Sequence, residues 1–425
     1  MKQKINVLVF PAGEINSIEL HDALSYCVNI NLFGASSIDR HGEYVFKNYI
    51  SGLPLIDSPL FLEKFNEILK TNKIDVVFPT HDSVAKFFSE NRELINAKVI
   101  VADKKTCAIC RDKRKTYEYF KEFDFIPKIY SEIKRFPVFI KPRESQGSKG
   151  AKLINSGNEL PPNINLNDYV ICEYLPGEEY TVDCLTDKNG KLIFVSPRSR
   201  KRVLAGVTVS GAIEELTPEI QFIAENINKK MSFLGLWWFQ IKKDSQGRWK
   251  LLEISTRVAG TMCLTRARGV NLPLLSVYIA MNYDVDVTPN TYKVQVDRTL
   301  ISRYKIDYEY DTVYMDFDDT VIVNGKVNQY AIWFLFQCKN LNKKVILITK
   351  HENEIYDTFK EHGISQELFT KIIHLKIDDN KISYINPHKA IFIDNAYQER
   401  AAVARKYSIP VFDVDGIEVL LDWRS

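Results

Sequence analysis

Strand-like and helix-like segments alternate at both ends of this chain, whereas its middle carries strands in pairs. Each alternating block predicts a parallel sheet, because strands separated by helices pair in parallel. The middle predicts antiparallel hairpins. The expected strands lie at 7–10, 75–79 and 97–102 in the first block, and at 313–315, 345–348, 390–393 and 410–412 in the last.

Three segments follow from this pattern. We expect an N-terminal α/β domain at 1–105, a middle domain of α+β character at 106–305, and a small doubly wound domain at 312–425. The length of 425 residues agrees with roughly three units of about 150 residues each. The linker before the last domain is expected between Arg298 and Thr312, where charged and tyrosine residues cluster.

Composition and charge exclude several classes of protein. Hydrophobic residues make up 45% of the chain and charged residues 26%, as in ordinary globular proteins. The formal charge of +3, from 57 basic and 54 acidic residues, is too small to predict a nucleic-acid or anionic-membrane partner. No apolar run reaches 18 residues, so no transmembrane helix is predicted. The seven scattered cysteines favour the cytoplasm, and the lone Cys107-x-x-Cys110 pair is better explained as two small side chains beside a helix than as a metal site.

A loop rich in small residues runs from Lys141 to Gly150 between two expected strands. Ser145, Gly147 and Gly150 would let backbone N–H groups approach a phosphate closely, and Lys141 would add positive charge. The loop is not a Walker loop, which requires a helix after the glycines. A solvated turn is the alternative, and the loop alone does not decide between the two.

A hairpin candidate at 236–254 carries more information. If Gln246-Gly247 is its two-residue turn, Gln240 lies opposite Glu253. Side chains two apart share a face, so Ser255 and Arg257 would project on the same side. Gln and Glu oxygens suit Mg²⁺, and Arg257 could clamp a phosphoryl group. A solvent-facing polar surface is the alternative, but the apolar neighbours favour partial burial, and a buried Glu needs a cationic partner.

Residues 1 to about 300 resemble ATP-grasp enzymes, in the branch of carbamoyl-phosphate synthase and amino-acid ligases. The resemblance rests on the order and spacing of Pro79-Thr-His-Asp82, Arg111-Asp-Lys113, Phe139-Ile-Lys-Pro142, Cys172-Glu-Tyr-Leu-Pro-Gly-Glu-Glu-Tyr-Thr-Val-Asp183 and Leu252-Glu-Ile-Ser-Thr-Arg257. It implies an ATP-grasp fold, in which an N-terminal parallel-sheet domain precedes two ATP-grasp sub-domains.

The same resemblance implies roles for individual residues. Lys113 and Lys141 would bind phosphate, Glu173, Tyr174 and Leu175 would border the adenine, and Glu179 would contact the ribose. Gln240 and Glu253 would ligate Mg²⁺, and Arg257 would steady the transferred phosphoryl group. Ser255 stands where the family usually has Asn, although a hydroxyl can still ligate magnesium. The basic run at 198–202 is either a nucleic-acid patch or a loop near the phosphates, and the small net charge favours the second.

The last block carries an acidic motif directly after an apolar strand. Asp316 could attack phosphorus and form an aspartyl-phosphate, and Asp318 could serve as general acid and base. Two acids near one phosphate require a cation, so Mg²⁺ is expected, with Asp316 and Asp318 among its ligands. An acidic turn at the end of a strand is the alternative interpretation.

Residues 312–425 resemble haloacid dehalogenase-like phosphatases. The matching stretches are Asp316-Phe-Asp-Asp-Thr320, Ile346-Leu-Ile-Thr349 and Ile391-Phe-Ile-Asp394. The resemblance implies that Thr349 holds the phosphoryl group, that Asp394 ligates the metal, and that Lys381, rather than Lys376 or Lys389, supplies the third motif. Asn395 stands where many members carry a second acid. Only 32 residues separate Asp316 from Thr349, which leaves no room for a substantial cap domain.

Together these resemblances predict a bifunctional cytoplasmic enzyme that uses ATP and Mg²⁺. A ligase would join a small carboxylate to an amine through an acyl phosphate, and a phosphatase would act on a phosphorylated metabolite. The alternative is a small-molecule kinase whose last domain is a non-catalytic binding or scaffold module. We expect no nucleic acid and no membrane as partners; the oligomeric state is left open, with a homodimer as the candidate assembly.

Overall fold

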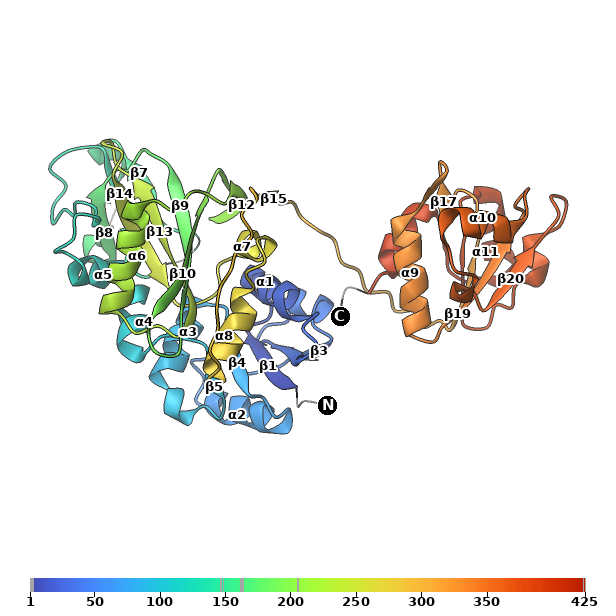
Figure 1. Cartoon of the computed structure of the whole chain (residues 1–425), viewed down its shortest axis with the longest axis horizontal. Coiled ribbons are helices and arrows are strands. Elements are labelled where there is room, and N and C mark those ends of the chain that lie inside the picture. Colours follow the sequence, from blue (N-terminus) through green and yellow to red (C-terminus); the bar gives the residue numbers. More distant parts are fainter. Residues whose placement is uncertain are drawn as a thin grey trace. The chain divides into compact units, whose positions relative to one another are not determined.

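A computed structural model describes residues 4–145, 147, 149–160, 164–204, 206–422 and 424. The chain divides between Leu300 and Ile301 into two compact units, coloured from blue to yellow and from orange to red in Figure 1. No helix in the described part of the chain combines the length and apolar character that a membrane span requires.

A five-stranded parallel sheet begins the first unit, in the order β3-β2-β1-β4-β5. Strands β1 and β4 are almost wholly buried, as expected for strands covered on both faces. They place Glu14 and His81, the residues before helices α1 and α3, at the carboxyl edge of the sheet. The elements are β1 (Ile5–Phe10), α1 (Ile15–Leu24), β2 (Ile30–Ala35), β3 (Asn48–Ile50), α2 (Phe61–Thr71), β4 (Val76–Pro79), α3 (Asp82–Glu90) and β5 (Lys98–Val99).

Two short helices and a three-stranded sheet follow. The Asp103 and Asp112 side chains accept hydrogen bonds from backbone N–H groups at the starts of the two helices, which satisfies donors that a helix leaves free. Lys113 is therefore fixed at the first position of α5. The elements are α4 (Lys104–Arg111), α5 (Lys113–Tyr119), β6 (Val138–Pro142), β7 (Lys152–Ile154) and β8 (Tyr169–Glu173), and the sheet order is β7-β6-β8.

A four-stranded antiparallel sheet, β10-β9-β13-β14, forms the centre of the first unit. A smaller sheet, β11-β12-β15, and three helices accompany it (Figure 1). The elements are β9 (Glu179–Thr186), β10 (Leu192–Ser199), β11 (Arg202–Leu204), β12 (Val207–Ala212), α6 (Pro218–Lys230), β13 (Gly235–Lys243), β14 (Trp249–Ser255), α7 (Cys263–Ala267), α8 (Leu272–Ala280) and β15 (Gln295–Asp297).

The register of the β13–β14 hairpin agrees with the prediction, although its turn does not. Gln240 pairs with Glu253, but the loop is Ser245-Gln246-Gly247, because Asp244 and Arg248 still pair. The loop is one residue longer than predicted, and a bulge at Leu252 compensates for this residue. Gln240 therefore pairs with Glu253 as predicted. The carbonyl of Leu252 accepts hydrogen bonds from Tyr117 Oη at 2.8 Å and Lys141 Nζ at 3.2 Å.

One hydrophobic core joins the two predicted N-terminal segments. The phenylalanines of the parallel sheet and its helices, such as Phe10 and Phe88, pack in the same buried cluster as Val182 and Trp237 of the antiparallel sheet. Because burying apolar surface is the main driving force of folding, this shared core explains why residues on both sides of position 105 form one unit.

The second unit is a doubly wound domain with the parallel order β20-β19-β16-β21-β22. The segment between β16 and β19 contains one helix and a hairpin of two short strands, β17 (Ile322–Val323) and β18 (Lys326–Val327). The remaining elements are β16 (Thr312–Met315), α9 (Gln329–Asn340), β19 (Lys344–Thr349), α10 (Ile355–His362), β20 (Lys371–His374), β21 (Ala390–Ile393), α11 (Tyr397–Tyr407) and β22 (Val411–Phe412).

Candidate functional site

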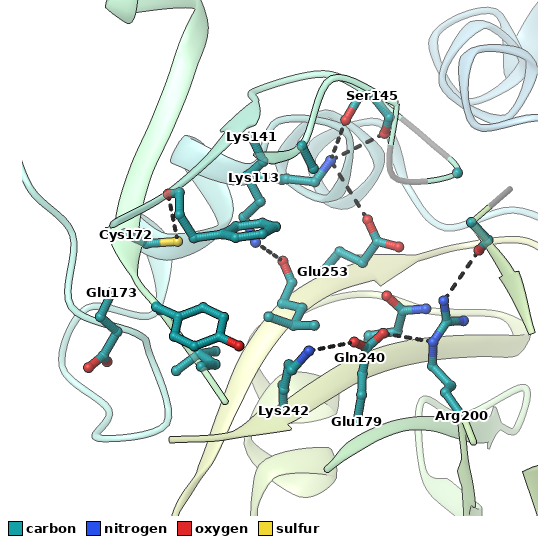
Figure 2. Close-up of a pocket in the computed structure, with 17 residues that line it drawn as sticks. Lys113, Lys141, Ser145, Cys172, Glu173, Glu179, Arg200, Gln240, Lys242 and Glu253 are labelled. Atoms are coloured by element: carbon teal, nitrogen blue, oxygen red, sulfur yellow. Dashed lines mark hydrogen bonds and ion pairs between the residues drawn. The ribbon is translucent and has the colours of Figure 1, made fainter. Parts of the chain in front are cut away.

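A pocket lies between the three-stranded sheet and the central sheet of the first unit (Figure 2). Most of the residues predicted to bind a nucleotide line it: Lys113, Lys141, Ser145, Gly147, Glu173, Tyr174, Leu175 and Glu179, together with Gln240 and Glu253. Gly150 is not part of its lining. Gly150 has a φ of +78°, and a Cβ at this position would lie 2.8 Å from Pro142 Cγ. The backbone conformation and the contact with Pro142 therefore account for a glycine here.

Two buried lysines supply positive charge to the pocket. Lys141 Nζ contacts Tyr117 Oη and the Leu252 carbonyl, and no carboxylate among the described residues forms an ion pair with it. Lys113 Nζ lies 3.2 Å from the Ser145 carbonyl and 3.7 Å from Glu253 Oε2. Burial lowers the pKa of both ammonium groups, only partly opposed by Glu253. Both sites therefore favour an anionic ligand, which would restore the charged forms.

Glu253 and Gln240 face each other across β13 and β14 at the same pocket. The Gln240 amide nitrogen donates a hydrogen bond to Glu253 Oε1 at 3.2 Å, and the amide oxygen accepts one from Arg200 Nη1 at 2.9 Å. Magnesium is a hard cation that takes oxygen ligands, and a carboxylate and a side-chain amide each provide one. The donor set therefore fits a magnesium ion, for which Glu253 would supply charge and Gln240 a neutral oxygen.

Glu179 and Arg200 extend the polar floor of the pocket. Glu179 is bridged by Arg200 Nε at 2.7 Å and Lys242 Nζ at 3.3 Å. Sequence reasoning did not assign a role to Lys242. This residue lies two positions after Gln240 on β13, so the two side chains point to the same face of the strand. Glu173 is oriented differently, because its carboxylate accepts a hydrogen bond from the backbone N–H of Lys128 at 2.8 Å.

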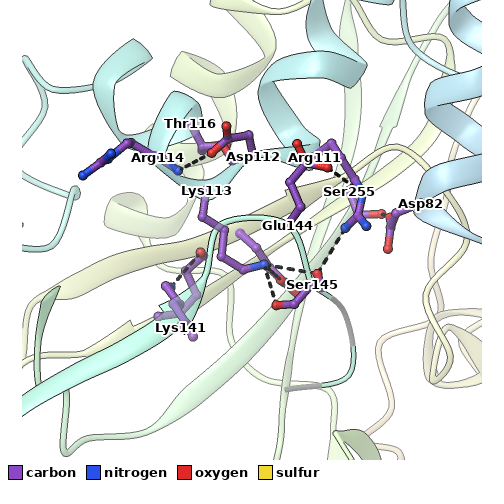
Figure 3. A network of polar contacts seen from close by, with 12 residues as sticks. Asp82, Arg111, Asp112, Lys113, Arg114, Thr116, Lys141, Glu144, Ser145 and Ser255 are labelled. Atoms are coloured by element: carbon purple, nitrogen blue, oxygen red, sulfur yellow. Dashed lines mark hydrogen bonds and ion pairs between the residues drawn. The ribbon is translucent and has the colours of Figure 1, made fainter. Parts of the chain in front are cut away.

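Asp82 organises a second group of polar side chains beside the pocket (Figure 3). Ser255 Oγ donates to Asp82 Oδ1 at 2.8 Å, and Arg257 Nη2 lies 2.9 Å from Asp82 Oδ2. Burial raises the pKa of Asp82, but Arg257 and the Ser255 hydroxyl lower it by more, so the carboxyl is ionised. The predicted metal ligand Ser255 thus shares a strand face with Glu253 but donates its hydroxyl to Asp82.

The comparisons with known proteins agree with this architecture. Residues 165–300 match the family described as ATP-grasp in the biosynthetic pathway with Ter operon. The chain is 26% identical over 245 residues to a carbamoyl-phosphate synthase of Methanobrevibacter smithii; the match covers 50% of this chain and spans 65%, or just under two thirds, of that protein.

Two solved structures show the same fold. N5-carboxyaminoimidazole synthetase from Staphylococcus aureus, complexed with ADP, has a TM-score of 0.55 at 14% identity, over 68% of this chain and 80% of that one. The biotin carboxylase domain of Hydrogenobacter thermophilus 2-oxoglutarate carboxylase, complexed with MgADP and bicarbonate, has a TM-score of 0.53 at 17% identity, over 68% and 72%. About two thirds of the chain has an ATP-grasp fold.

Within the ATP-grasp unit, the basic run at 198–202 is not the loop expected from sequence. Strand β10 continues to Ser199, and Arg198 is buried against Asp183, with Nε–Oδ2 and Nη2–Oδ1 distances of 2.9 Å. Arg200 reaches Glu179 in the pocket, and Arg202 pairs with Asp297 at the surface. The run therefore splits into a core residue, a pocket residue and a surface residue.

Cys107 and Cys110 both lie on helix α4. Cys107 and Cys110 are free thiols, and the described residues contain no group of three or more His, Cys, Asp or Glu side chains placed to hold a metal ion.

In the second unit, the predicted phosphatase residues meet at the carboxyl edge of the parallel sheet. Asp316 and Asp394 follow the adjacent strands β16 and β21, and Lys381 Nζ lies 2.7 Å from Asp316 Oδ1 and 2.8 Å from Asp394 Oδ2. Burial, together with Asp394, raises the pKa of Asp316 to about 7, despite the opposing effect of Lys381. Burial lowers the pKa of Lys381, but the two carboxylates raise it above its usual value. Of the three lysines considered, Lys381 is the one in contact with both acids.

Thr349 and Asp318 occupy the neighbouring positions. Thr349 Oγ1 lies 3.3 Å from Asp318 Oδ2, and the Asp318 side chain is half exposed. Sequence reasoning missed His351, whose Nδ1 lies 2.8 Å from Asp318 Oδ1 and whose Nε2 lies 2.8 Å from Thr358 Oγ1. Lys381 lies between Asp316 and Asp394, and both oxygens of Asp318 contact Thr349 or His351, so among the described residues these three acids do not form a group placed to hold a metal ion.

A glycine-to-glycine contact at the mouth of the nucleotide pocket gives a first prediction. Gly206 has a φ of +79°, and a Cβ there would lie 2.2 Å from the Gly147 carbonyl carbon and oxygen. Because of this clash, Gly206→Ala is expected to displace the backbone at Gly147 and to raise the Kd for Mg·ADP about five- to tenfold in calorimetric titrations, a loss of about 1–1.4 kcal/mol of binding free energy.

The matched control is Gly190→Ala. Gly190 has a φ of +82° with nothing within 4 Å of the added Cβ, so it carries the same backbone strain away from the pocket. Both variants are expected to lose similar thermal stability, and only the change at Gly206 is expected to weaken binding. Equal Kd values for both variants would contradict the role of this contact.

Proposed function

We propose that the ATP-grasp unit is an ATP-dependent carboxylate–amine ligase and that the second unit is a Mg²⁺-dependent phosphatase. The observation that carries the ligase proposal is the convergence of two buried lysines, Lys113 and Lys141, with Gln240 and Glu253 on one pocket. This set provides for both a polyphosphate and a divalent cation. The neighbours solved with ADP and MgADP support the same ligands.

The proposed ligase reaction has two steps. A carboxylate oxygen attacks the γ-phosphorus of ATP; an O–P bond forms, the bond to the β,γ-bridging oxygen breaks, and ADP leaves with the electron pair. An amine nitrogen then attacks the acyl carbon; a C–N bond forms, phosphate leaves with the C–O electron pair, and the amine proton passes to solvent. Lys113, Lys141 and Arg257 would hold the phosphate oxygens and offset their charge. A magnesium ion held by Glu253 and Gln240 would add Lewis-acid stabilisation of the same charge.

The proposed phosphatase reaction uses the acids of the second unit. Asp316 Oδ would attack the phosphorus of an ester, and Asp318 would protonate the departing alkoxide. Water would then cleave the aspartyl-phosphate, with Asp318 accepting its proton and phosphate leaving. Lys381 and Thr349 would hold the phosphoryl oxygens, and Asp316, Asp318 and Asp394 would be the candidate ligands of a magnesium ion. The open edge left by the short β17–β18 hairpin supports access for a large substrate.

Isotope transfer separates the ligase from the alternative kinase. The enzyme is incubated with Mg·ATP, an amine pool and carboxylic acids labelled with ¹⁸O in the carboxyl group. An acyl phosphate delivers one ¹⁸O atom to the released phosphate, whereas a kinase that phosphorylates a hydroxyl does not. We expect acid-dependent ADP and labelled phosphate in equal amounts; ADP with a stable phosphorylated product and no labelled phosphate would support the kinase instead.

The assay is run in an Asp316→Asn background. An active second unit would otherwise hydrolyse a kinase product and release phosphate that resembles a ligase product.

A further inference from the structure

We propose that a second cleft of the ATP-grasp unit binds a polyhydroxylated carboxylic acid, as the acid substrate of the ligase. This inference rests on the proposed function and narrows its substrate class. The cleft has a volume of about 670 Å³ and shares Arg200, Gln240 and Glu253 with the nucleotide pocket. An acid held there lies beside the groups that would bind the γ-phosphate and the metal.

Apart from Arg200 Nε, which lies 2.7 Å from Glu179 Oε1, buried polar atoms of four residues that line this cleft have no hydrogen-bond partner among the described residues. They are Nε1 of Trp238, Nε of Arg257, and the hydroxyl oxygens of Thr181 and Thr208. Trp238, Thr181 and Thr208 are at most 5% exposed, and the side chain of Arg257 is 10% exposed. Because buried polar groups in folded proteins nearly always have partners, four such atoms around one cleft point to a ligand that supplies them.

His81 adds a further donor to this cleft. Its Nδ1 accepts a hydrogen bond from the backbone N–H of Ser83 at 3.2 Å, so the neutral ring carries its proton on Nε2. Burial lowers the pKa of His81, which favours that neutral form, although Asp82 opposes the effect. Trp238, Arg257 and His81 thus present N–H groups that can donate a hydrogen bond but cannot accept one.

The opposite wall of the cleft carries acceptors. Glu14 lies there at the start of α1, with only a distant pairing to Arg40 at 3.7 Å. The amide nitrogen of Asn16 donates to the Thr80 carbonyl at 3.1 Å, which leaves its oxygen as the acceptor, next to Gly260.

This combination selects for hydroxyl groups. An ammonium group only donates hydrogen bonds and a carboxylate only accepts them, whereas a hydroxyl does both. A second carboxylate on the ligand would face Glu14 and Glu253, and an ammonium group, which accepts no hydrogen bond, would leave the N–H groups of Trp238 and His81 without a partner. A hydroxylated chain can accept from the N–H wall and donate to Glu14 and Asn16, while its single carboxylate approaches Arg257.

Matched acid pools test the substrate class. ADP release is measured with Mg·ATP, ammonia and one of four pools of equal chain length: aldonic acids of three to six carbons, unsubstituted fatty acids, dicarboxylic acids and α-amino acids. We expect the aldonic pool to stimulate ADP release at least about tenfold more than any other, because a site built to hydrogen-bond hydroxyls rejects analogues that lack them. Equal or better stimulation by another pool would overturn the inference and assign the unpaired atoms to bound water.

A binding measurement keeps the inference separable from the ligase proposal. Thermal shifts are recorded with Mg and a non-hydrolysable ATP analogue, with and without each pool. A shift by the nucleotide but by no aldonic acid would overturn the substrate class and leave the nucleotide site intact. Absence of any nucleotide shift would instead overturn the proposed function.

Removal of one hydroxyl tests the contact directly. Thr208→Val keeps the branched shape, and we expect it to raise the KM of the best hydroxy acid about three- to tenfold, with the KM of ATP and of the matching fatty acid unchanged. Thr208→Ser keeps the hydroxyl and is expected to restore the original KM. The control is Ser196→Ala, which removes an equally buried unpartnered hydroxyl that lines a different groove. An equal rise for hydroxy and fatty acids, or an unchanged KM in folded Thr208→Val, would contradict the contact.

Discussion

Glu253→Gln is expected to lower acid-dependent ADP release by the ATP-grasp unit at least about 100-fold. The substitution keeps the shape of the side chain but removes the one negative charge that the Gln240–Glu253 pair offers to a cation. Metal-assisted stabilisation of transferring phosphate charge is on the order of several kcal/mol, and each 1.4 kcal/mol is a factor of about ten in rate. The loss is measured as initial rates over a range of Mg²⁺ concentrations.

Two further measurements separate a metal role from a structural one. The Mg²⁺ concentration for half-maximal rate should rise in the variant, whereas the Kd for ADP without Mg²⁺ should change by less than about threefold, because Lys113 and Lys141 remain. Glu178→Gln is the matched control: Glu178 directly precedes β9 and pairs at 2.7 Å with Lys243 of the β13–β14 hairpin, but it is exposed and outside the pocket. A Glu253→Gln variant that keeps more than a tenth of the wild-type rate would show that Glu253 does not carry the cation.

The residues that sequence could place are those whose positions follow from one repeating geometry. The resemblance to haloacid dehalogenase-like phosphatases predicted Asp316, Thr349 and Asp394 as one site, and the structure brings them together because parallel strands end at one edge of a sheet. Alternation along two antiparallel strands likewise brought Gln240 opposite Glu253. The hairpin prediction reached the right pair through a wrong turn, because the three-residue loop and the bulge at Leu252 offset each other.

Residues that tertiary packing brings together were harder to predict from the sequence. Asp82 belongs to a helix start about 170 residues before Ser255 and Arg257, and no spacing rule predicts that its carboxylate contacts both. Spacing favoured Lys381 over Lys376 and Lys389 only moderately, and its contacts with two acids, from the start of a short 3₁₀ helix (Lys381–Tyr384), distinguish it in the structure. Strands β2 and β3 are hard to recognise by pattern, because β2 contains Asn31 and Gly34, residue types that are rare in strands, and β3 is three residues long.

The pattern of charged residues was the least reliable basis for predicting where side chains lie. The run Arg198-Ser-Arg-Lys-Arg202 looks like one basic surface, yet the pleat of β10 turns alternate side chains to opposite faces. Arg198 is consequently buried against Asp183, which is itself fully buried and accepts a further hydrogen bond from Thr265 at 2.7 Å. Asp183, an acid within the otherwise mostly apolar end of β9 and three residues before Thr186, was the available sequence clue to this pair.

Asp316→Asn is expected to lower phosphate-ester hydrolysis by the second unit at least about 10³-fold. The amide has the size of the carboxylate but cannot act as the nucleophile, and loss of the nucleophile in a covalent hydrolase removes most of its rate acceleration. Hydrolysis is followed with p-nitrophenyl phosphate and Mg²⁺. Folding should be preserved, because the substitution relieves the repulsion between Asp316 and Asp394 and leaves Lys381 paired with Asp394 at 2.8 Å.

Control measurements distinguish a phosphatase from a scaffold and test whether Asp316 is the nucleophile. Asp357→Asn removes an exposed carboxylate from the same unit and should leave the rate unchanged. ADP release by the ATP-grasp unit should be unaffected by Asp316→Asn, since none of its pocket residues is altered. Persistent hydrolysis in folded Asp316→Asn would show that another group attacks phosphorus. If the wild-type chain hydrolyses neither p-nitrophenyl phosphate nor acetyl phosphate with Mg²⁺ present, the scaffold alternative is favoured, because an intact aspartate nucleophile held at 2.7 Å by Lys381 should act on both activated compounds.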